Sequence, residues 1–300
     1  MSHRWAVSEA RFPRVIDEFG RIERMFLRRA EDAYVSDEAI AQQWQSLGYR
    51  GHPDFARAVA EYERFAALLR DFGIVIEFLP KDDRLGLDSI YVRDAAVVAP
   101  GGMILANMGK RARAAEPRVV AEHFRMLGLP IKGAIGSSGR LEGGDVVWLA
   151  KQTVAVGCGY RTNEKGIREF KSLLGSAVEA LIVPLPHWNG PNDVMHLMSL
   201  ISPVDRDLAV VYSPLLPVPF RQALLARGLR LIEVPPEEFD SLGCNVLTLA
   251  PRHCIMLKGN SRTRALLERE GVEVHEFEGN EIALKGGGGP TCLTLPVIRN

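Results

Sequence analysis

The apolar and polar positions of this chain follow a pattern that recurs five times. In each copy, a helical run ends in glycine and passes at once into a short apolar run typical of a strand. Glycine suits this junction because it readily adopts the positive φ with which many helices end. The five terminal glycines, spaced by 55, 47, 53 and 43 residues, are Gly73, Gly128, Gly175, Gly228 and Gly271.

Pairs of short apolar runs joined by a turn lie between these units, and each pair predicts a β-hairpin. The four clear pairs are DAAVVAPGGMILA, DVVWLAKQTVAVG, DLAVVYSPLLP and NVLTLAPRHCIML. A fifth, less complete pair would join the C-terminal TCLTLPVIRN to the N-terminal RWAVSEA. A strand-turn-strand-helix-strand unit present five times favours a radially closed α/β propeller with a central site. The alternative is an ordinary α/β domain whose helices happen to end in glycine.

Composition narrows the function classes. The 37 basic and 37 acidic side chains balance, so no basic field favours a nucleic-acid partner. No apolar run approaches the roughly 20 residues of a membrane span, and MSHRWAVSEARF lacks the apolar core of a secretory signal. Four scattered cysteines are too few for a disulfide framework, so we expect a cytoplasmic protein with reduced thiols.

Cys292 is the first candidate for chemistry. It follows the glycine run Gly286–Gly289 and Pro290, a backbone able to approach a ligand closely, and it leads into an apolar strand. A thiolate at such a place is a potential nucleophile. Most free cysteines are inert fillers of the core, and that is our interpretation of the other three, Cys158, Cys244 and Cys254.

His196 is the favoured proton shuttle among seven histidines. It lies in the apolar run VMHLMSLI, and Glu142 of the tight LEGGD segment could orient and charge it. The rival is His187, in the loop-like PHWNGPND segment. Because the cysteines and histidines show no close ligand pair such as CxxC or HxxxH, we expect no metal and no cofactor.

Further polar residues stand at the edges of the predicted hairpins, where a radial array would bring them to one centre. They are Asp88, Asp94, Asp145 and Asn245.

Five motifs, in order, carry a resemblance to a known superfamily: DSIYVRD, LEGGD, GYRTNEKG, the MHL of VMHLMS, and GGGGPTCLTLP. They resemble the guanidino-group modifying superfamily, which includes arginine deiminases, dimethylarginine dimethylaminohydrolases and amidinotransferases. The resemblance runs from residue 88 to the C-terminus and is weaker over the first 60 residues. It implies the five-bladed α/β propeller called the pentein fold, and thus a single catalytic domain over residues 1–300.

The resemblance also implies roles. Cys292 would be the nucleophile, His196 the general acid/base, and Glu142 the group that holds the imidazole. Asp94 would bind the guanidinium nitrogens, and Asp88 would also lie beside the substrate. Two further residues are expected to contact it, Asp145 and Arg161. Arg161 would grip an α-carboxylate, although a surface ion pair is the alternative reading.

The implied reaction is hydrolysis of a guanidinium C–N bond of (methyl)arginine or a related small guanidino compound. It gives a ureido product and an amine through a covalent thiouronium. An arginine deiminase or an amidinotransferase would use the same site, and a non-catalytic guanidino-binding protein is the alternative from another class. A homodimer is left open.

Two departures from the family pattern bear on the substrate. Met198 stands where the histidine motif commonly continues HLD, which would suit an N-alkylated guanidinium. Asn107 stands where relatives often place an arginine of the carboxylate clamp. Either Arg111 or Arg113 replaces that arginine, or the substrate lacks an α-carboxylate. We also expect residues 35–50 to form a helical lid beside the pocket.

Overall fold

A computed structural model describes residues 17–136, 138–191, 193 and 195–300. The strands are β1 (Ile22–Leu27), β2 (Val75–Phe78), β3 (Ala96–Ala99), β4 (Gly102–Leu105), β5 (Ile131–Ala134), β6 (Val146–Ala150), β7 (Thr153–Cys158), β8 (Glu179–Pro184), β9 (Ile201–Asp205), β10 (Leu208–Val211), β11 (Arg230–Glu233), β12 (Leu247–Ala250), β13 (His253–Leu257), β14 (Glu273–Phe277) and β15 (Leu295–Arg299). The helices are α1 (Ala30–Tyr34), α2 (Asp37–Gln43), α3 (Phe55–Asp71), α4 (Glu116–Met126), α5 (Glu164–Leu174), α6 (Val218–Ala226), α7 (Pro236–Phe239) and α8 (Ser261–Arg269).

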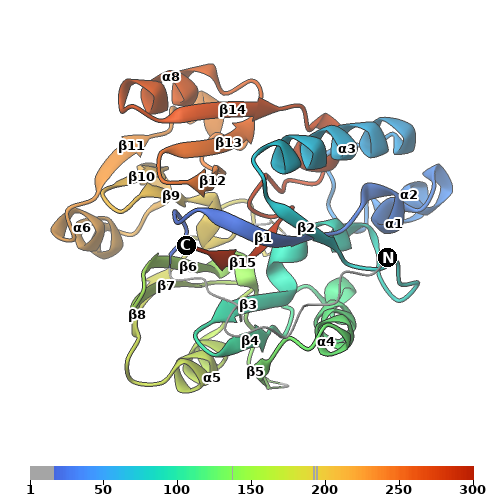
Figure 1. Ribbon diagram of the computed structural model, residues 1–300, viewed down its shortest axis with the longest axis horizontal. Helices are drawn as coiled ribbons and strands as arrows, with labels where there is room; N and C mark the ends of the chain where they lie inside the picture. The colour runs from blue at the N-terminus through green and yellow to red at the C-terminus, as the bar shows by residue number, and fades with distance from the viewer. Residues whose placement is uncertain (1–16, 137, 192, 194) are drawn as a thin grey trace.

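Within this described part of the chain, the strands form five three-stranded sheets, which confirms the predicted fivefold repeat. In each sheet the middle strand pairs antiparallel with one neighbour and parallel with the other. A helix makes each parallel connection, as parallel pairing requires. Figure 1 shows the sheets arranged around a centre, with these connecting helices on the outside.

The predicted glycines end the helical connections. All five have φ between +73° and +87°, a conformation that costs a residue with a Cβ about 1 kcal/mol or more. At the other end of α5, the Asn163 side chain accepts a hydrogen bond from the Gly166 N–H at 2.8 Å, as expected of an N-cap. α8 begins at Ser261, with Asn260 as its N-cap residue.

The two ends of the chain close the ring. β15 pairs antiparallel with β1, and β1 pairs parallel with β2, so one blade combines both termini. The predicted C-terminal strand is therefore confirmed, but its partner is Ile22–Leu27. The RWAVSEA segment that we expected there lies outside the described residues.

Burial places the first strand of each blade nearest the axis. β3 and β15 are buried at every residue, and β6 is buried except at its last residue. The third strands β2 and β5, by contrast, are only partly buried. Segments that enter the first strands must therefore meet near the centre. This convergence is what creates a site.

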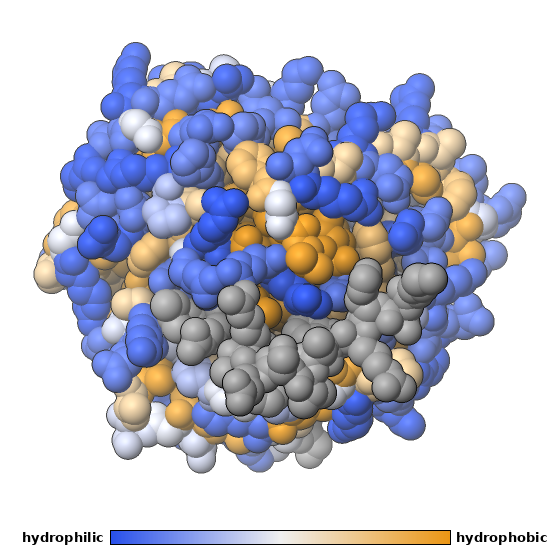
Figure 2. All heavy atoms as spheres, in the orientation of Figure 1, coloured by the Kyte–Doolittle hydropathy of each residue, from blue (hydrophilic) through white to orange (hydrophobic). Residues whose placement is uncertain are grey.

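Hydrophilic residues cover much of the face seen in Figure 2, and hydrophobic residues gather near its centre. Among the helices of the described residues, none is both long and apolar enough to cross a membrane.

Candidate active site

The five repeats place equivalent positions at one end of the axis. Asp94 precedes β3, Glu142 precedes β6, His196 precedes β9, Asn245 precedes β12 and Cys292 precedes β15, each by two to five residues. Since these first strands lie innermost, residues separated by up to about 200 positions in the sequence come together. The fivefold pattern therefore explains why one site draws on every blade.

A cavity of about 320 Å³ lies at this convergence. Five residues predicted for the site line it, together with Arg113, one of the two clamp candidates, and four residues that were not assigned a role from sequence. Its lining is Asp88, Tyr91, Asp94, Lys110, Arg113, Arg161, His196, Gly286, Gly288 and Cys292.

Glu142 and His196 form a buried pair behind the cavity. The Glu142 Oε2 lies 2.7 Å from the His196 Nε2. The other oxygen, Oε1, accepts from the backbone N–H groups of Gly109 and Lys110 at 2.8 and 3.0 Å. Burial alone would raise the pKa of Glu142, but His196 and Arg161 outweigh it and hold that pKa below its usual value. Glu142 is therefore a carboxylate that fixes the imidazole.

The surroundings of His196 favour its protonated form. Burial opposes the positive charge, but nearby carboxylates outweigh it and raise the pKa of His196 to about 9. The Asp94 Oδ1 lies 3.7 Å from its Nδ1. Asp145 also contributes to the shift. An imidazolium beside the cavity can give a proton to a departing amine.

Asp145 is outside the cavity lining and contacts the turn that carries His196. It is fully buried, and its Oδ1 accepts from the Leu197 N–H at 3.0 Å. Burial raises the pKa of this carboxyl to about 6. The geometry makes Asp145 a support for the turn that carries His196, and its direct contact with substrate stays a prediction.

Asp94 already has partners on both oxygens. Its Oδ1 accepts from the Gly144 N–H at 2.9 Å, and its Oδ2 from the Arg113 Nη1 at 2.5 Å. Arg113 is itself held by both oxygens of Glu116 at 2.7 Å. Arg113 therefore neutralises buried acids, whereas Arg111, the other candidate for the carboxylate clamp, is exposed.

Lys110 is the cation that sequence analysis missed. Its Nζ lies 2.6 Å from the Asp88 Oδ2 and donates to the Leu47 carbonyl, also at 2.6 Å. The only sequence signal was its place three residues after Asn107. Leu47 belongs to the segment 35–50 predicted as a lid, where α2 is the helical part. That segment thus reaches the cavity through Lys110, and its movement stays a prediction.

Two further predicted substrate contacts, besides Asp145, do not line the cavity. Asn107 donates through its side-chain amide to the backbone oxygens of Gly136 and Gly139. Met198 is 3% exposed and packs among core residues including Leu200 and Ile201. A direct role for either side chain in binding stays a prediction.

Cys292 is half-buried, with the Asn245 Nδ2 at 3.7 Å and the Thr291 Oγ1 at 3.8 Å from its sulfur. Burial and the nearby Asp94 charge raise the pKa of the thiol to about 11. These two effects favour the neutral thiol of Cys292 over the thiolate. The rival base His187 is outside the cavity lining, and its Nδ1 lies 2.6 Å from the Tyr160 hydroxyl.

The ligand atoms of Asp94, Glu142 and His196 lie within 4.8 Å of one another, close enough to hold a metal ion. The guanidinium groups of Arg113 and Arg161 already pair with two of these carboxylates. A divalent cation would face that positive charge and would have to displace these partners. Metal independence stays our prediction.

Gly144→Ala tests the tight packing around His196. A Cβ at residue 144 would lie 2.5 Å from the His196 Nδ1 and 2.8 Å from the Asp94 Oδ1. A displacement of about 1 Å can cost roughly 100-fold in rate. We expect turnover to fall by about that factor, measured as product formation beside a thermal melt. In Gly51→Ala the new Cβ meets atoms at 3.7 Å or more, so this control should keep its activity.

The fold and this site define the class of the protein: a pentein of the guanidino-group modifying superfamily, and a hydrolase of amidine C–N bonds. Residues 31–299 match the family described as N,N dimethylarginine dimethylhydrolase, eukaryotic, and the chain belongs to this family.

Three relatives illustrate the range of similar sequences. An uncharacterized protein of Aeropyrum pernix is 30% identical over 83% of this chain and 88% of its own length. The uncharacterized protein YkgA of Bacillus subtilis is 27% identical over 94% of both chains. An arginine deiminase of Mycobacterium marinum is 29% identical over 77% of this chain and 63% of its own length.

Solved structures share the fold at lower identity. The dimethylarginine dimethylaminohydrolase of Pseudomonas aeruginosa, a mutant complexed with citrulline, superposes with a TM-score of 0.73 and 22% identity, covering 92% of this chain and 99% of that one. SxtG, an amidinotransferase of Microseira wollei, has a TM-score of 0.76 and 18% identity over 95% and 97% of the two chains.

Proposed function

We propose that this protein hydrolyses a guanidinium C–N bond of methylated arginine or a close guanidino compound, giving a ureido product and an amine. One observation carries the proposal: Cys292, His196 and Asp94 face a single cavity, with Glu142 fixing the imidazole. A thiol, an imidazolium and an anion together match covalent attack on a cationic carbon. A protein that only binds a ligand has no use for this combination.

The substrate's own charge would prepare the nucleophile. A guanidinium placed between Asp94 and Cys292 brings a positive charge next to the thiol, which lowers its pKa from about 11. The thiol gives its proton to solvent, and the thiolate attacks the guanidinium carbon and forms a C–S bond. Collapse of the tetrahedral adduct breaks the C–N bond, and His196 gives its proton to the departing amine.

The second half of the reaction uses the same groups. The amine leaves, and neutral His196 takes a proton from a water molecule that attacks the thiouronium carbon. The C–S bond then breaks, the second proton of the water passes to the departing Cys292 sulfur, and the ureido product forms. His196 keeps the first proton, so both groups return to their starting protonation states. Glu142 keeps the ring oriented through both steps.

Methylated arginine is the first choice of substrate because the chain belongs to the dimethylarginine family. Plain arginine is the second candidate, favoured by the similarity to mycobacterial arginine deiminases. Met198, in place of the usual aspartate, also favours the methylated substrate, although its side chain does not line the cavity. The purified protein should be offered arginine, monomethylarginine and dimethylarginine in parallel, with the ureido product and the released amine both measured. Citrulline with dimethylamine supports the first choice, and citrulline with ammonia from arginine supports the second.

Lys110 is the residue we propose for the substrate's carboxylate, together with Arg161. Both line the cavity, whereas Arg111 is exposed outside that lining and Arg113 already pairs with Asp94 and Glu116. Lys110 uses two of its three N–H donors on Asp88 and Leu47, which leaves the third for the carboxylate. Lys110→Met should raise KM about 10- to 100-fold, the value of one charge-assisted hydrogen bond, with a smaller change in kcat. Steady-state kinetics would measure it, with exposed Arg111→Met as the matched control. An unchanged KM would place the carboxylate elsewhere.

We expect the protein to act in the cytoplasm on a small molecule, without metal or cofactor and without nucleic acid. Assembly into a homodimer stays a prediction.

A further inference from the structure

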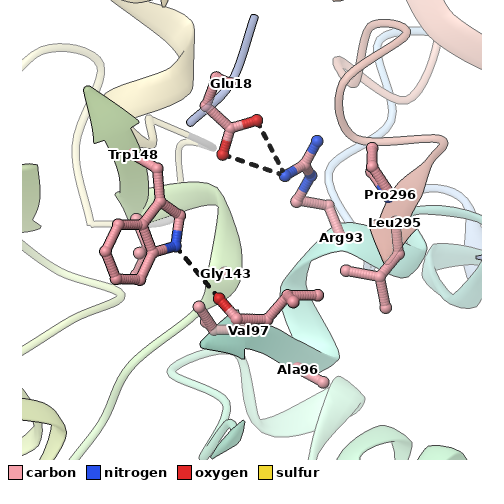
Figure 3. A pocket seen from close by; sticks show the side chains of 10 residues that line it. Glu18, Arg93, Ala96, Val97, Gly143, Trp148, Leu295 and Pro296 are labelled. Atoms are coloured by element: carbon pink, nitrogen blue, oxygen red, sulfur yellow. Dashed lines mark hydrogen bonds and ion pairs between the residues drawn. The ribbon is translucent and has the colours of Figure 1, made fainter. Parts of the chain in front are cut away.

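Arg93 lies next to Asp94 in the sequence, but its side chain serves a different cavity. Residues 92–95 form a short 3₁₀ turn in which Asp94 faces the active-site cavity. Arg93 instead lines a second cavity of about 300 Å³, walled by first-strand residues of three blades. Figure 3 shows this cavity, with the Glu18 carboxylate facing the Arg93 guanidinium beside Trp148. Arg93 therefore sits on the propeller axis, beside the active site but outside its lining.

The contacts of Arg93 lead to the nucleophile. Its backbone N–H donates to the Cys292 carbonyl at 3.2 Å. Its Nε lies 3.2 Å from the carbonyl oxygens of both Thr291 and Thr294. One residue thus satisfies three carbonyls of the four-residue segment that carries the thiol. Buried carbonyls need such partners, so the course of this segment depends on Arg93.

Glu18 fixes Arg93 from the opposite side. Its two carboxylate oxygens lie 3.4 and 3.5 Å from the Arg93 Nη1. Its own backbone N–H donates to the Trp148 carbonyl at 3.0 Å, which ties the segment before β1 to the axis. The Glu18 Oε2 also lies 3.8 Å from the Arg299 Nη2. Glu18, Arg93 and Arg299 form one buried group of charges, the axial cluster.

The axial cluster carries an excess of positive charge, because two guanidinium groups share the Glu18 carboxylate. The neighbouring acid, Asp17, turns its Oδ1 to the backbone N–H groups of Phe19 and Gly20. Within the described part of the chain, the Arg93 Nη2 has no hydrogen-bond partner. The positive charge of Arg93 is thus incompletely neutralised. This charge lowers the pKa of Cys292, whereas burial and Asp94 raise it.

We propose that Arg93 is a positioning residue for the nucleophile: it holds segment 291–294 from the axial side, stabilises the Cys292 thiolate with its charge, and is itself held by Glu18. The inference rests on the proposed function, in which Cys292 attacks the substrate. It adds a residue that never touches the substrate, and it gives the segment before β1 a part in catalysis.

Arg299→Met is the matched control for Arg93→Met. Both arginines are buried and both approach Glu18, but Arg299 Nη1 donates to Gly20 and Thr248, away from the nucleophile segment. The loss of a buried charge should lower the melting temperature of both variants. An effect confined to Arg93→Met therefore separates positioning of Cys292 from general stability.

The readout is the rate at which neutral iodoacetamide alkylates Cys292, followed by mass spectrometry from about pH 7 to pH 9, where the rate follows the thiolate fraction. Arg93→Met should react about tenfold more slowly at each pH, as a pKa rise of about one unit requires. Its kcat should fall about 10- to 100-fold with a smaller change in KM. Arg299→Met should alkylate at the wild-type rate. Equal slowing in both variants, or none in Arg93→Met, would overturn the proposal.

If Arg93→Met does not fold, Arg93→Lys tests the positioning role instead. Lysine keeps the charge but cannot reproduce the planar fork of donors, so alkylation should stay near the wild-type rate while kcat falls. Wild-type kcat in Arg93→Lys would contradict the positioning role. Because alkylation needs no substrate, wild-type protein that makes no ureido product would refute the proposed function without touching these results.

Discussion

Cys292→Ser is expected to abolish formation of the ureido product, by about 10⁴-fold or more, while the protein still binds its guanidino substrate. Loss of a nucleophile removes the covalent route entirely, and such losses reach about 10⁶-fold in other enzymes. A serine hydroxyl at this position would stay protonated, because Asp94 and burial already hold the pKa of the more acidic thiol at about 11. Product assays combined with calorimetric titration of substrate would measure both quantities.

Cys158→Ser is the control for that experiment. Cys158 is also a partly exposed free thiol, but it lies in β7 and outside the cavity lining. This variant should turn over substrate at the wild-type rate. If Cys292→Ser kept both binding and turnover, the proposed nucleophile would be wrong. If the wild type bound the guanidino substrate but formed no ureido product, a binding protein would be favoured.

Glu142→Gln is expected to lower kcat by about 10²- to 10⁴-fold, the usual contribution of general acid–base catalysis. Glutamine keeps the size of the side chain but removes the charge that favours the imidazolium. The pKa of His196 should therefore fall from about 9 towards its ordinary value. As the pH rises, His196 in this variant should therefore lose its proton at a lower pH than in the wild type. NMR titration of the imidazole ring would measure the shift directly.

Glu164→Gln supplies the comparison, because Glu164 is an exposed carboxylate at the start of α5. It should leave both kcat and the His196 titration unchanged. Glu142→Gln also leaves Arg161 without its carboxylate partner, so a melt must accompany the assay. A folded Glu142→Gln protein with an unshifted His196 titration would contradict the role of Glu142.

The fold was accessible from sequence because its signals repeat. Helix-ending glycines such as Gly128 and Gly228 sit at comparable spacings, and each has the positive φ that the prediction required. Sequence could not predict which strand pairs with β15, because no hairpin turn connects the apolar run Ile22–Leu27 to it. Pairing between the two ends of a chain leaves no local signal.

Site residues could be predicted from sequence where the residue type and the local motif already indicate the chemistry. Cys292, His196 and Glu142 stand in distinctive motifs, and the structure brings all three together. Lys110 and Arg93 were assigned no role, because an exposed cation and a buried one look alike in sequence. Their contacts depend on which blades meet, and that is a property of the whole ring.

The central claim is that Cys292 attacks a guanidino carbon and forms a thiouronium. The most direct test is peptide mass spectrometry of wild-type protein that is acid-quenched during turnover of dimethylarginine or arginine, beside Cys292→Ser. Acid protonates the base that activates water, so the adduct present at the quench should be retained. We predict that the peptide containing Cys292 gains the mass of the substrate less its leaving amine. Unmodified Cys292 in samples that release amine and form the ureido product would contradict the account.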